Sequence, residues 1–207
     1  IPVLGNLISC KENCEAAFGT DYRGIRDLVS RAFGNPLPPA LTTQAPVHEN
    51  VKLPGEFDLG CDLPVLRHTD GDNGRLITAG IIIVQDPVTG VYNASYQRLH
   101  LLGANRTAIK LDFGRHLRLA YERAQQLGKP LPITVCIGTD LAVQYTAATM
   151  GSQMPESADE LAIAGALRGS ALPVVQARTQ PMHYPAETEI ALEGRSEEHT
   201  SELQSRE

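Results

Sequence analysis

The chain has 207 residues, of which 42% are hydrophobic and 20% charged, and its formal net charge is −6. This length predicts one domain or two small ones, and the composition excludes wholesale disorder. An acidic balance without any run of Lys or Arg disfavours nucleic acid as a partner. No apolar run approaches the roughly 20 residues that a membrane helix needs, so we expect a cytoplasmic protein without a membrane span.

Both ends of the chain indicate a piece of a longer protein. The chain begins at Ile1 rather than Met, and residues 195–207 are polar and lack apolar periodicity. Residues 195–205 also match, in order, what one reading frame of a common sequencing adapter encodes. We therefore interpret residues 195–207 as a non-native, adapter-derived tail that makes few contacts, and we expect the natural protein to continue beyond Gly194. A natural acidic tail is the alternative.

The first predicted element is a helix over residues 21–32, where apolar residues recur at helical spacing and Gly34 can end the helix. The proline-rich residues 35–39 then predict a stiff extended linker. The next part of the chain is typical of loops with short extended pieces, such as residues 49–53. Residues 68–74 are rich in Asp, Asn and Gly, which predicts a cluster of turns.

Strand signals dominate the middle of the chain. Residues 76–85 are rich in β-branched side chains, and a turn over residues 86–90 joins them to a second strand over residues 91–100, as in a β-hairpin. The later elements follow no regular order: a strand over residues 107–111, a helix over 115–127, a buried strand over 132–137, a second helix over 156–169, and strands over 172–176 and 187–192. Because regular βαβ alternation is absent, we predict an α+β domain with a barrel-like sheet.

The cysteines and short motifs point to no local chemistry. The spacing of Cys10, Cys14, Cys61 and Cys136 matches neither a CxxC pair nor a zinc ribbon. Cys10 and Cys14 could form a metal or redox pair on a short helix, but reduced cysteines that fill small apolar sites are the plainer interpretation. Residues 70–74 resemble the start of a calcium loop, yet the residues that follow exclude an EF-hand.

An ordered set of segments resembles one enzyme family, although no single segment is decisive. The segments are LGNL at 4–7, AFG at 17–19, Ala45-Pro46 with His48-Glu49-Asn50, GIIIVQDP at 80–87, NASYQR at 93–98, Gly114-Arg115-His116, ELAIAGALRG at 160–169 and YPAETEIALEG at 184–194. Together they span nearly all of residues 1–194 in the right order. They are similar to the UbiD-type family of prenylated-flavin-dependent aromatic acid decarboxylases.

The resemblance implies a fold and a domain division. The family has an N-terminal α/β region, a central split β-barrel related to flavin reductases, and a C-terminal oligomerisation domain. We therefore expect residues 1–68 to be part of the N-terminal region and residues 69–194 to form the split-barrel, cofactor-binding domain. The C-terminal domain is absent from this chain, and the full-length protein would be a homo-oligomer.

The resemblance also implies a cofactor site. It places the ligands of a divalent metal, manganese or a relative, at Asn93, His116 and Glu160, and these residue types suit a borderline-to-hard cation. The metal would bridge the phosphate of prenylated FMN, with a monovalent cation such as potassium nearby. Taken singly, Glu160 would form a capping box with Ser157, His116 would be a surface residue and Asn93 a turn or edge residue. The other expected cofactor-binding residues are Ala94, Ser95, Tyr96, Gln97, Arg98 and Arg115.

Arg98 resembles the catalytic arginine of the family, whose planar fork can hold a substrate carboxylate; taken singly, it would be a solvated strand residue. The implied reaction is the reversible, non-oxidative decarboxylation of an aromatic or α,β-unsaturated acid, with a cofactor supplied by a flavin prenyltransferase. The family's protonating glutamate follows the segment that ends at Gly194, so we expect this chain alone to be inactive. A split-barrel flavin redox protein and a cofactor-free, non-catalytic fragment are the alternatives.

The chain departs from the family pattern after Gly138. Residues 139–142 read Thr-Asp-Leu-Ala, and Leu141 stands where the family usually has proline. Leucine lacks the fixed φ of proline, so the loop could be shifted here. This departure puts in doubt any contact between residues 145–150 and a monovalent cation.

Overall fold

The computed structural model describes residue 5, residues 8–149 and residues 154–197. As predicted, these residues form an α+β structure. Its central sheet has the strand order β10-β7-β3-β4, and neighbouring strands run antiparallel. The strands are β3 (Ile81–Gln85), β4 (Tyr92–Tyr96), β7 (Pro132–Ile137) and β10 (Ile190–Arg195).

Two three-stranded sheets accompany the central sheet. In one, β8 (Pro173–Gln176) pairs in parallel with β1 (Ala40–Leu41) and antiparallel with β9 (His183–Pro185). The other is antiparallel, with the order β2-β5-β6. Its strands are β2 (Leu76–Ile77), β5 (Leu99–Gly103) and β6 (Arg106–Ile109).

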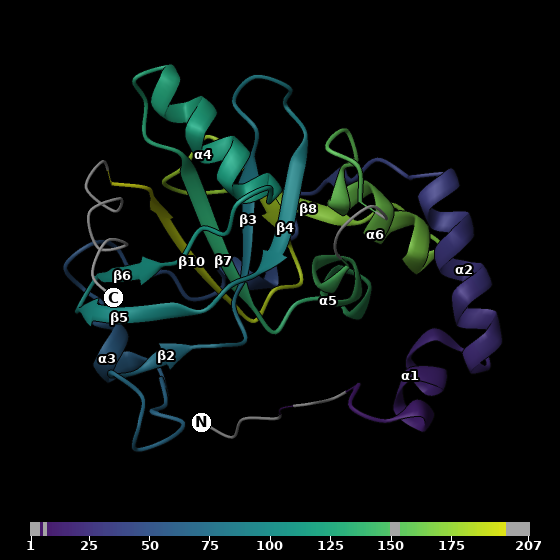
Figure 1. Ribbon diagram of the computed structural model, residues 1–207, viewed down its shortest axis with the longest axis horizontal. Helices are drawn as coiled ribbons and strands as arrows, with labels where there is room; N and C mark the ends of the chain where they lie inside the picture. Colours follow the sequence, from purple (N-terminus) through teal and green to yellow (C-terminus); the bar gives the residue numbers. More distant parts are fainter. Residues whose placement is uncertain (1–4, 6–7, 150–153, 198–207) are drawn as a thin grey trace.

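Most helices gather at one end of the molecule, opposite the β2-β5-β6 sheet (Figure 1). These are α1 (Lys11–Phe18), α2 (Tyr22–Gly34), α5 (Leu141–Ala148) and α6 (Glu160–Arg168). The remaining helical elements are the 3-10 helix η1 (Pro46–His48), α3 (Leu59–Asp62) and α4 (His116–Gln126). Within the described part of the chain, no helix has the length and apolar character needed to cross a membrane.

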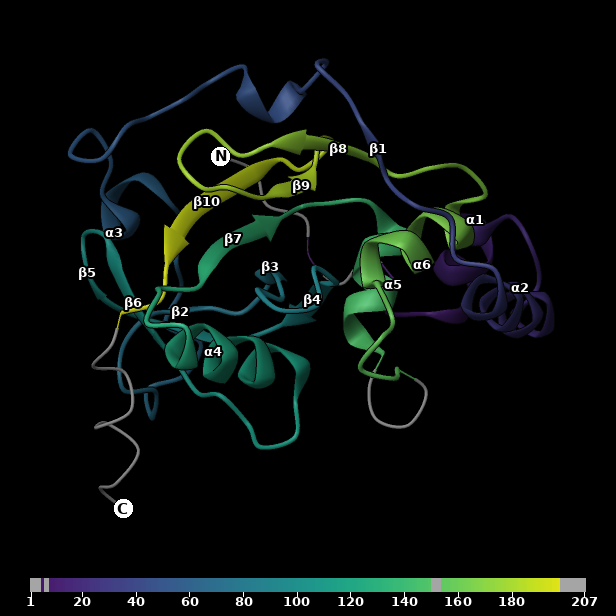
Figure 2. The ribbon, with the colours of Figure 1, turned by 90° about the horizontal axis from the view of Figure 1, so that it is seen from above.

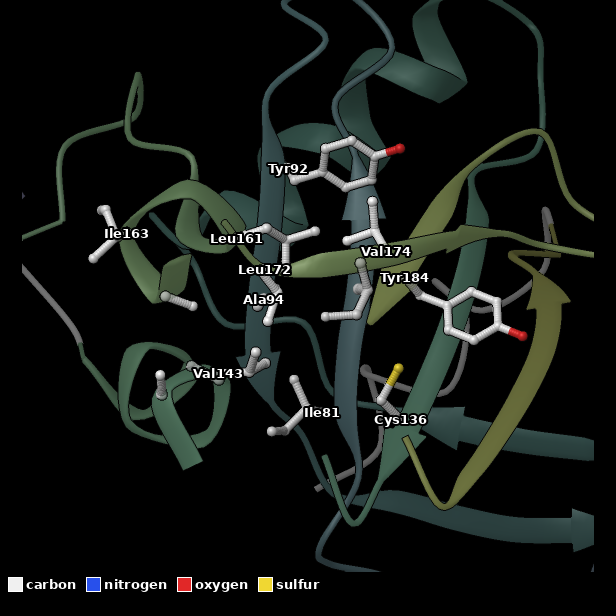
Figure 3. Close-up of a cluster of buried hydrophobic side chains, with 14 of the residues drawn as sticks. Ile81, Tyr92, Ala94, Cys136, Val143, Leu161, Ile163, Leu172, Val174 and Tyr184 are labelled. Atoms are coloured by element: carbon white, nitrogen blue, oxygen red, sulfur yellow. The ribbon is translucent and has the colours of Figure 1, made fainter. Parts of the chain in front are cut away.

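The central sheet carries a hydrophobic cluster on each face, because successive side chains of a strand point to opposite sides. Ile81 and Ile83 of β3 belong to the cluster formed with α5, α6, β8 and β9, whose side chains Figure 3 shows. Ile82 and Val84 belong to the cluster formed with α4. Figure 2 shows the resulting layers, with α4 on one side of the sheet and β8 and β9 on the other. Burial on both faces explains the continuous apolar run of β3.

Two predicted strands are in fact broken. The strand predicted over residues 76–85 is divided between β2 and β3, and the one predicted over residues 91–100 between β4 and β5. The hairpin itself is confirmed, because β3 pairs with β4, and Asp86 accepts hydrogen bonds from the Val88 and Thr89 N–H groups in the turn. The described strands form three separate sheets and no closed barrel, so the split barrel stays a prediction.

Sequence analysis missed α5, whose sequence is LAVQYTAA. Its buried residues Ala142, Val143, Thr146 and Ala147 lie on one side of the helix, but the apolar residues Leu141 and Ala148 lie on the opposite side, so the helical periodicity of the sequence is weak. The helix begins at Leu141, and the Asp140 side chain caps it by accepting a hydrogen bond from the Ala142 N–H group at 2.7 Å. Proline is common at this first helical position, so the family's proline and Leu141 suit the same place.

The start of the adapter-like segment is part of the fold. Arg195 pairs with Pro132 at the end of β10, and the Ser196 N–H group donates to the Leu131 carbonyl at 2.9 Å. Glu197 forms an ion pair with Arg106 at 2.6 Å. The expectation that this segment makes few contacts is therefore wrong for residues 195–197, and residues 198–207 lie outside the described residues.

All four cysteines are free thiols. Cys136 is buried in the cluster that Figure 3 shows, as expected of a cysteine that fills an apolar site. Cys10 and Cys61 are exposed and Cys14 is half-buried, so the same expectation is wrong for Cys10 and Cys61.

Candidate metal and cofactor site

Three side chains from separate elements meet at one point: Asn93 on β4, His116 at the start of α4 and Glu160 at the start of α6. Asn93 Nδ2 donates to Glu160 Oε1 across 2.8 Å, and His116 Nδ1 lies 3.4 Å from the same oxygen. Glu160 is 3% exposed and Asn93 8%, whereas His116 is half-buried. The structure thus brings together the three residues that the sequence predicts as metal ligands.

Two oxygen atoms of this cluster are buried without a hydrogen-bond partner. In the described residues only three buried side-chain polar atoms lack one, and two of them are Asn93 Oδ1 and Glu160 Oε2. An unpaired buried polar group costs about 1–3 kcal/mol, so such atoms are rare. An amide oxygen and a carboxylate oxygen beside an imidazole form a donor set that a divalent cation accepts. The residues therefore fit the expected metal.

No group of three His, Cys, Asp or Glu side chains within the described ranges is placed to hold a metal. A metal at this cluster therefore needs the amide oxygen of Asn93 as a ligand. Beside the cluster lies a pocket of about 20 Å³, whose walls include Asp86 and Glu156 as well as the three predicted ligands. That volume suits one water molecule or one ion.

Hydrogen bonding and burial have opposite effects on the pKa values of Glu160 and His116. Burial raises the pKa of the Glu160 carboxyl, although hydrogen bonds to His116 and Asn93 oppose the rise. The hydrogen bond with Glu160 raises the pKa of the His116 imidazole, and burial opposes that rise. The two groups therefore compete for a proton, and metal ions bind such ligands in place of protons.

The start of α6 differs from the prediction. The N-cap is Asp159, whose side chain accepts a hydrogen bond from the Ala162 N–H group at 2.9 Å. The alternative interpretation of Glu160 as a capping-box partner of Ser157 is therefore wrong, because Glu160 is itself the first residue of the helix. Its side chain is free to point at Asn93 and His116.

The other predicted cofactor residues extend away from this cluster. Ala94 is buried in the cluster of Figure 3, whereas the Tyr96 hydroxyl donates to Gln144 Oε1 at 3.3 Å. Gln97 Nε2 donates to Ser95 Oγ at 3.4 Å. Because side chains alternate along a strand, Ser95 shares the face of Asn93, while Ala94 and Tyr96 point the other way.

The two predicted arginines take different positions. Arg115 is half-buried and is the N-cap residue of α4, directly before His116. Arg98 is exposed between β4 and β5, and the structure does not bring it to the three predicted ligands.

Sequence reasoning missed the residue that links two walls of the pocket. Arg123 on α4 donates hydrogen bonds to Asp86 in the β3–β4 turn and to Glu156 in the segment before α6. Asp86 ends the segment GIIIVQDP, but nothing in the sequence pairs it with Arg123. These bonds hold α4, the β3–β4 turn and the approach to α6 around the predicted ligands.

Comparison with known proteins identifies relatives of one family. The UbiD family, described as the 3-octaprenyl-4-hydroxybenzoate carboxy-lyase Rift-related domain, matches residues 40–205. Over 94% of its length the chain is 33% identical to the anhydromevalonate phosphate decarboxylase of Methanothermobacter thermautotrophicus, and over 84% it is 34% identical to the pyrrole-2-carboxylic acid decarboxylase of Pseudomonas aeruginosa. It covers 44% and 35% of those two proteins.

A solved structure has the same fold. The UbiD-class enzyme HmfF from Pelotomaculum thermopropionicum, in complex with FMN, matches 90% of this chain with a TM-score of 0.82 and 35% identity. An evolved dimeric form of that enzyme has been solved in complex with prFMN. The match covers 41% of the first HmfF chain, so this chain spans less than half of the length of the relatives it matches.

Proposed function

Because this chain belongs to the UbiD family, we propose that it is the cofactor-binding part of a carboxy-lyase that uses metal-bound prenylated FMN. The reaction is the reversible, non-oxidative decarboxylation of aromatic or α,β-unsaturated carboxylic acids. One observation carries the proposal: Asn93 Oδ1 and Glu160 Oε2 are buried without partners beside His116. These are the side chains to which the family resemblance assigns the metal.

Asn93 Oδ1, Glu160 Oε2 and the imidazole of His116 would hold the divalent ion, for which we propose Mn²⁺. Only one of these ligands carries a negative charge, so the ion keeps a net positive charge that a phosphate can balance. Arg115 beside His116 adds positive charge, and no side chain caps the N-terminus of α4. Free N–H groups at a helix N-terminus favour a phosphate. We also propose a potassium ion nearby, and only the family resemblance supports it.

Arg98 would hold the substrate carboxylate through its guanidinium fork. It is exposed and makes no hydrogen bond or ion pair with the rest of the described chain, which leaves the fork available. Arg98 follows the end of β4, five residues after Asn93, so it would contact the substrate while Asn93 would help to hold the metal. When bound, the prenylated flavin supplies an electron sink for loss of carbon dioxide.

The split barrel over residues 69–194 also belongs to this proposal. The paired strands β3 and β4 continue directly into the paired strands β2 and β5 of the next sheet. Two neighbouring strands that bend together from one sheet into another support a barrel-like arrangement. We further propose that residues 1–68 are part of the N-terminal α/β region. The whole protein would be a cytoplasmic homo-oligomer that receives its cofactor from a flavin prenyltransferase.

The test is expression of the chain together with a flavin prenyltransferase, followed by metal analysis and an absorbance spectrum of the purified protein. The proposal predicts a divalent metal and a modified flavin in similar amounts. Flavin without metal would favour a split-barrel redox protein, and absence of both would favour a non-catalytic scaffold. Either of these results contradicts the proposal.

A further inference from the structure

One carboxylate bridges the two elements that carry Asn93 and Glu160. Asp159 directly precedes Glu160, and Tyr92 directly precedes Asn93. Asp159 Oδ2 accepts a hydrogen bond from the Tyr92 N–H group at 3.3 Å, while Asp159 Oδ1 accepts one from the Ala162 N–H group at 2.9 Å. The side chain therefore joins the first residue of β4 to the first turn of α6.

The bridge completes the hydrogen bonding of an edge strand. β4 is the last strand of the central sheet, so its outward N–H groups have no neighbouring strand to pair with. Tyr92 is only 7% exposed, and Asp159 accepts from its N–H group. Without Asp159, this buried donor would lose its partner. The hydrogen bond therefore stabilises β4 at this position against α6.

Among the other aspartates that cap helices, Asp140 of α5 also reaches a second element, through an ion pair with Arg168 of α6, whereas Asp21 and Asp58 do not. Asp21 caps α2 by accepting a hydrogen bond from Gly24, and Asp58 caps α3 by accepting from Gly60 and Cys61. The hydrogen bonds that the Asp21 and Asp58 side chains accept stay within the helix that each residue caps. Asp159 also reaches a residue 67 positions earlier, on the strand that carries a predicted ligand. Capping alone does not account for this second bond.

We infer that Asp159 is a positioning residue of the metal site, which holds β4 and α6 in the register that brings Asn93 Oδ1 and Glu160 Oε2 to one ion. The inference rests on the proposed function. Asn93 and Glu160 each directly follow one end of the bridge along the chain, so the bridge sets the separation of their backbones. Loss of a group that orients metal ligands typically lowers metal affinity by about 10–100-fold.

Two substitutions separate positioning from capping. Asp159→Asn retains one oxygen for the start of α6, where Asn is a good cap, but it turns an NH2 group toward the Tyr92 N–H group. Asp159→Ala removes both acceptors. Mn²⁺ affinity is measured by titrating MnCl2 into the purified 207-residue chain with saturating FMN, and free Mn²⁺ is followed by electron paramagnetic resonance. A thermal unfolding curve of each variant accompanies the titration.

We expect Asp159→Asn to weaken Mn²⁺ binding by about 10–100-fold while its thermal midpoint stays close to that of the wild type. Asp159→Ala should weaken binding as much and also lower the midpoint, because the cap is lost. Asp159→Ser retains a capping oxygen without a second acceptor and should weaken binding as Asp159→Asn does. Asp159→Ser decides the matter if Asp159→Asn does not fold.

Two controls define the comparison. Asp21→Asn changes a cap on α2, away from the site, and should leave Mn²⁺ affinity unchanged. Glu156→Gln removes a negative charge from the same pocket and weakens the ion pair with Arg123 without touching the bridge, so it measures the loss from these two changes together. Wild-type affinity in Asp159→Asn, or a loss no larger than that in Glu156→Gln, overturns the inference and leaves the proposed function standing. A wild-type chain that does not bind Mn²⁺ overturns both.

Discussion

His48 lies in a hydrogen-bonded chain that joins three elements. Its Nε2 atom is 2.9 Å from the hydroxyl of buried Tyr184, which donates to Glu193 Oε1 across 3.3 Å. Glu193 also accepts hydrogen bonds from the N–H groups of Arg178 and Thr179. Burial lowers the pKa of the His48 imidazole, and the charge of Arg178 lowers it further, while Glu193 acts in the opposite direction. At this single residue, folding therefore disfavours protonation.

We expect His48→Gln to make the free energy of unfolding less dependent on pH between about pH 7 and pH 5. A histidine whose pKa is lower in the folded state stabilises the fold above its unfolded pKa of 6.5, and this contribution is lost as the pH falls. Urea unfolding of wild type and variant at several pH values measures the difference. An advantage of the wild type that grows as the pH falls would contradict this assignment.

The sequence was enough to name three residues that the structure brings together, but not several of the contacts around them. Asn93, His116 and Glu160 could be named because ordered segments place each of them in register with one family. The cap at Asp159 and the bonds of Arg123 to Asp86 and Glu156 join elements that are distant in sequence. Spacing along a single chain carries no information on such pairs.

At the scale of elements, α6 depends on the absence of a side chain at Gly165. A Cβ atom there would lie 2.7 Å from the Leu37 carbonyl oxygen and 3.2 Å from the Leu172 nitrogen. The Leu37 N–H group donates to the Ala162 carbonyl of the same helix at 2.9 Å. The proline-rich segment therefore lies directly on the helix that begins with Glu160.

Gly165→Ala should lower the free energy of unfolding by about 1–3 kcal/mol, because the neighbouring backbone atoms cannot move away as a side chain could. This cost exceeds the gain of about 1 kcal/mol that alanine brings to a helix interior. Gly34→Ala, at the end of α2, is the matched control, since a Cβ atom there meets nothing within 4 Å. Urea unfolding measures both; a Gly165→Ala chain as stable as Gly34→Ala would refute the close approach.

Elements with one apolar face were predictable, and elements without one were not. The helices predicted over residues 21–32 and 115–127 correspond to α2 and α4, whose buried residues lie on one stripe. The two long strands were predicted without their breaks, because an alternating pattern does not change where a strand passes into a second sheet. α5 was missed because apolar residues occur on both sides of it, so its sequence shows little helical periodicity.

At the scale of the whole molecule, the two hydrophobic clusters share the central sheet. Leu117 of α4 is 3% exposed in one cluster, and Leu161 of α6 is fully buried in the other. Adjacent residues of β3 belong to different clusters, so both clusters pack on the same strand. The shared strand couples the two sides of the molecule.

Leu117→Ala and Leu161→Ala should therefore each lower the free energy of unfolding by about 2–5 kcal/mol, in one transition that the whole molecule shares. The chain has six Tyr and no Trp, so tyrosine fluorescence and far-ultraviolet circular dichroism are the two probes to compare. The account predicts coincident urea curves from both probes for both variants. Two separate transitions, with only one moved by each variant, would show that the clusters unfold independently.

The most direct test of the central claim is the metal and flavin content of His116→Ala and Glu160→Ala, each co-expressed with a flavin prenyltransferase. His48→Gln, a half-buried histidine outside the site, is the matched control. The account predicts that both site variants lose the divalent metal and the modified flavin, while His48→Gln retains both. Metal and flavin contents equal to those of the wild type in both site variants would contradict the assignment of Asn93, His116 and Glu160.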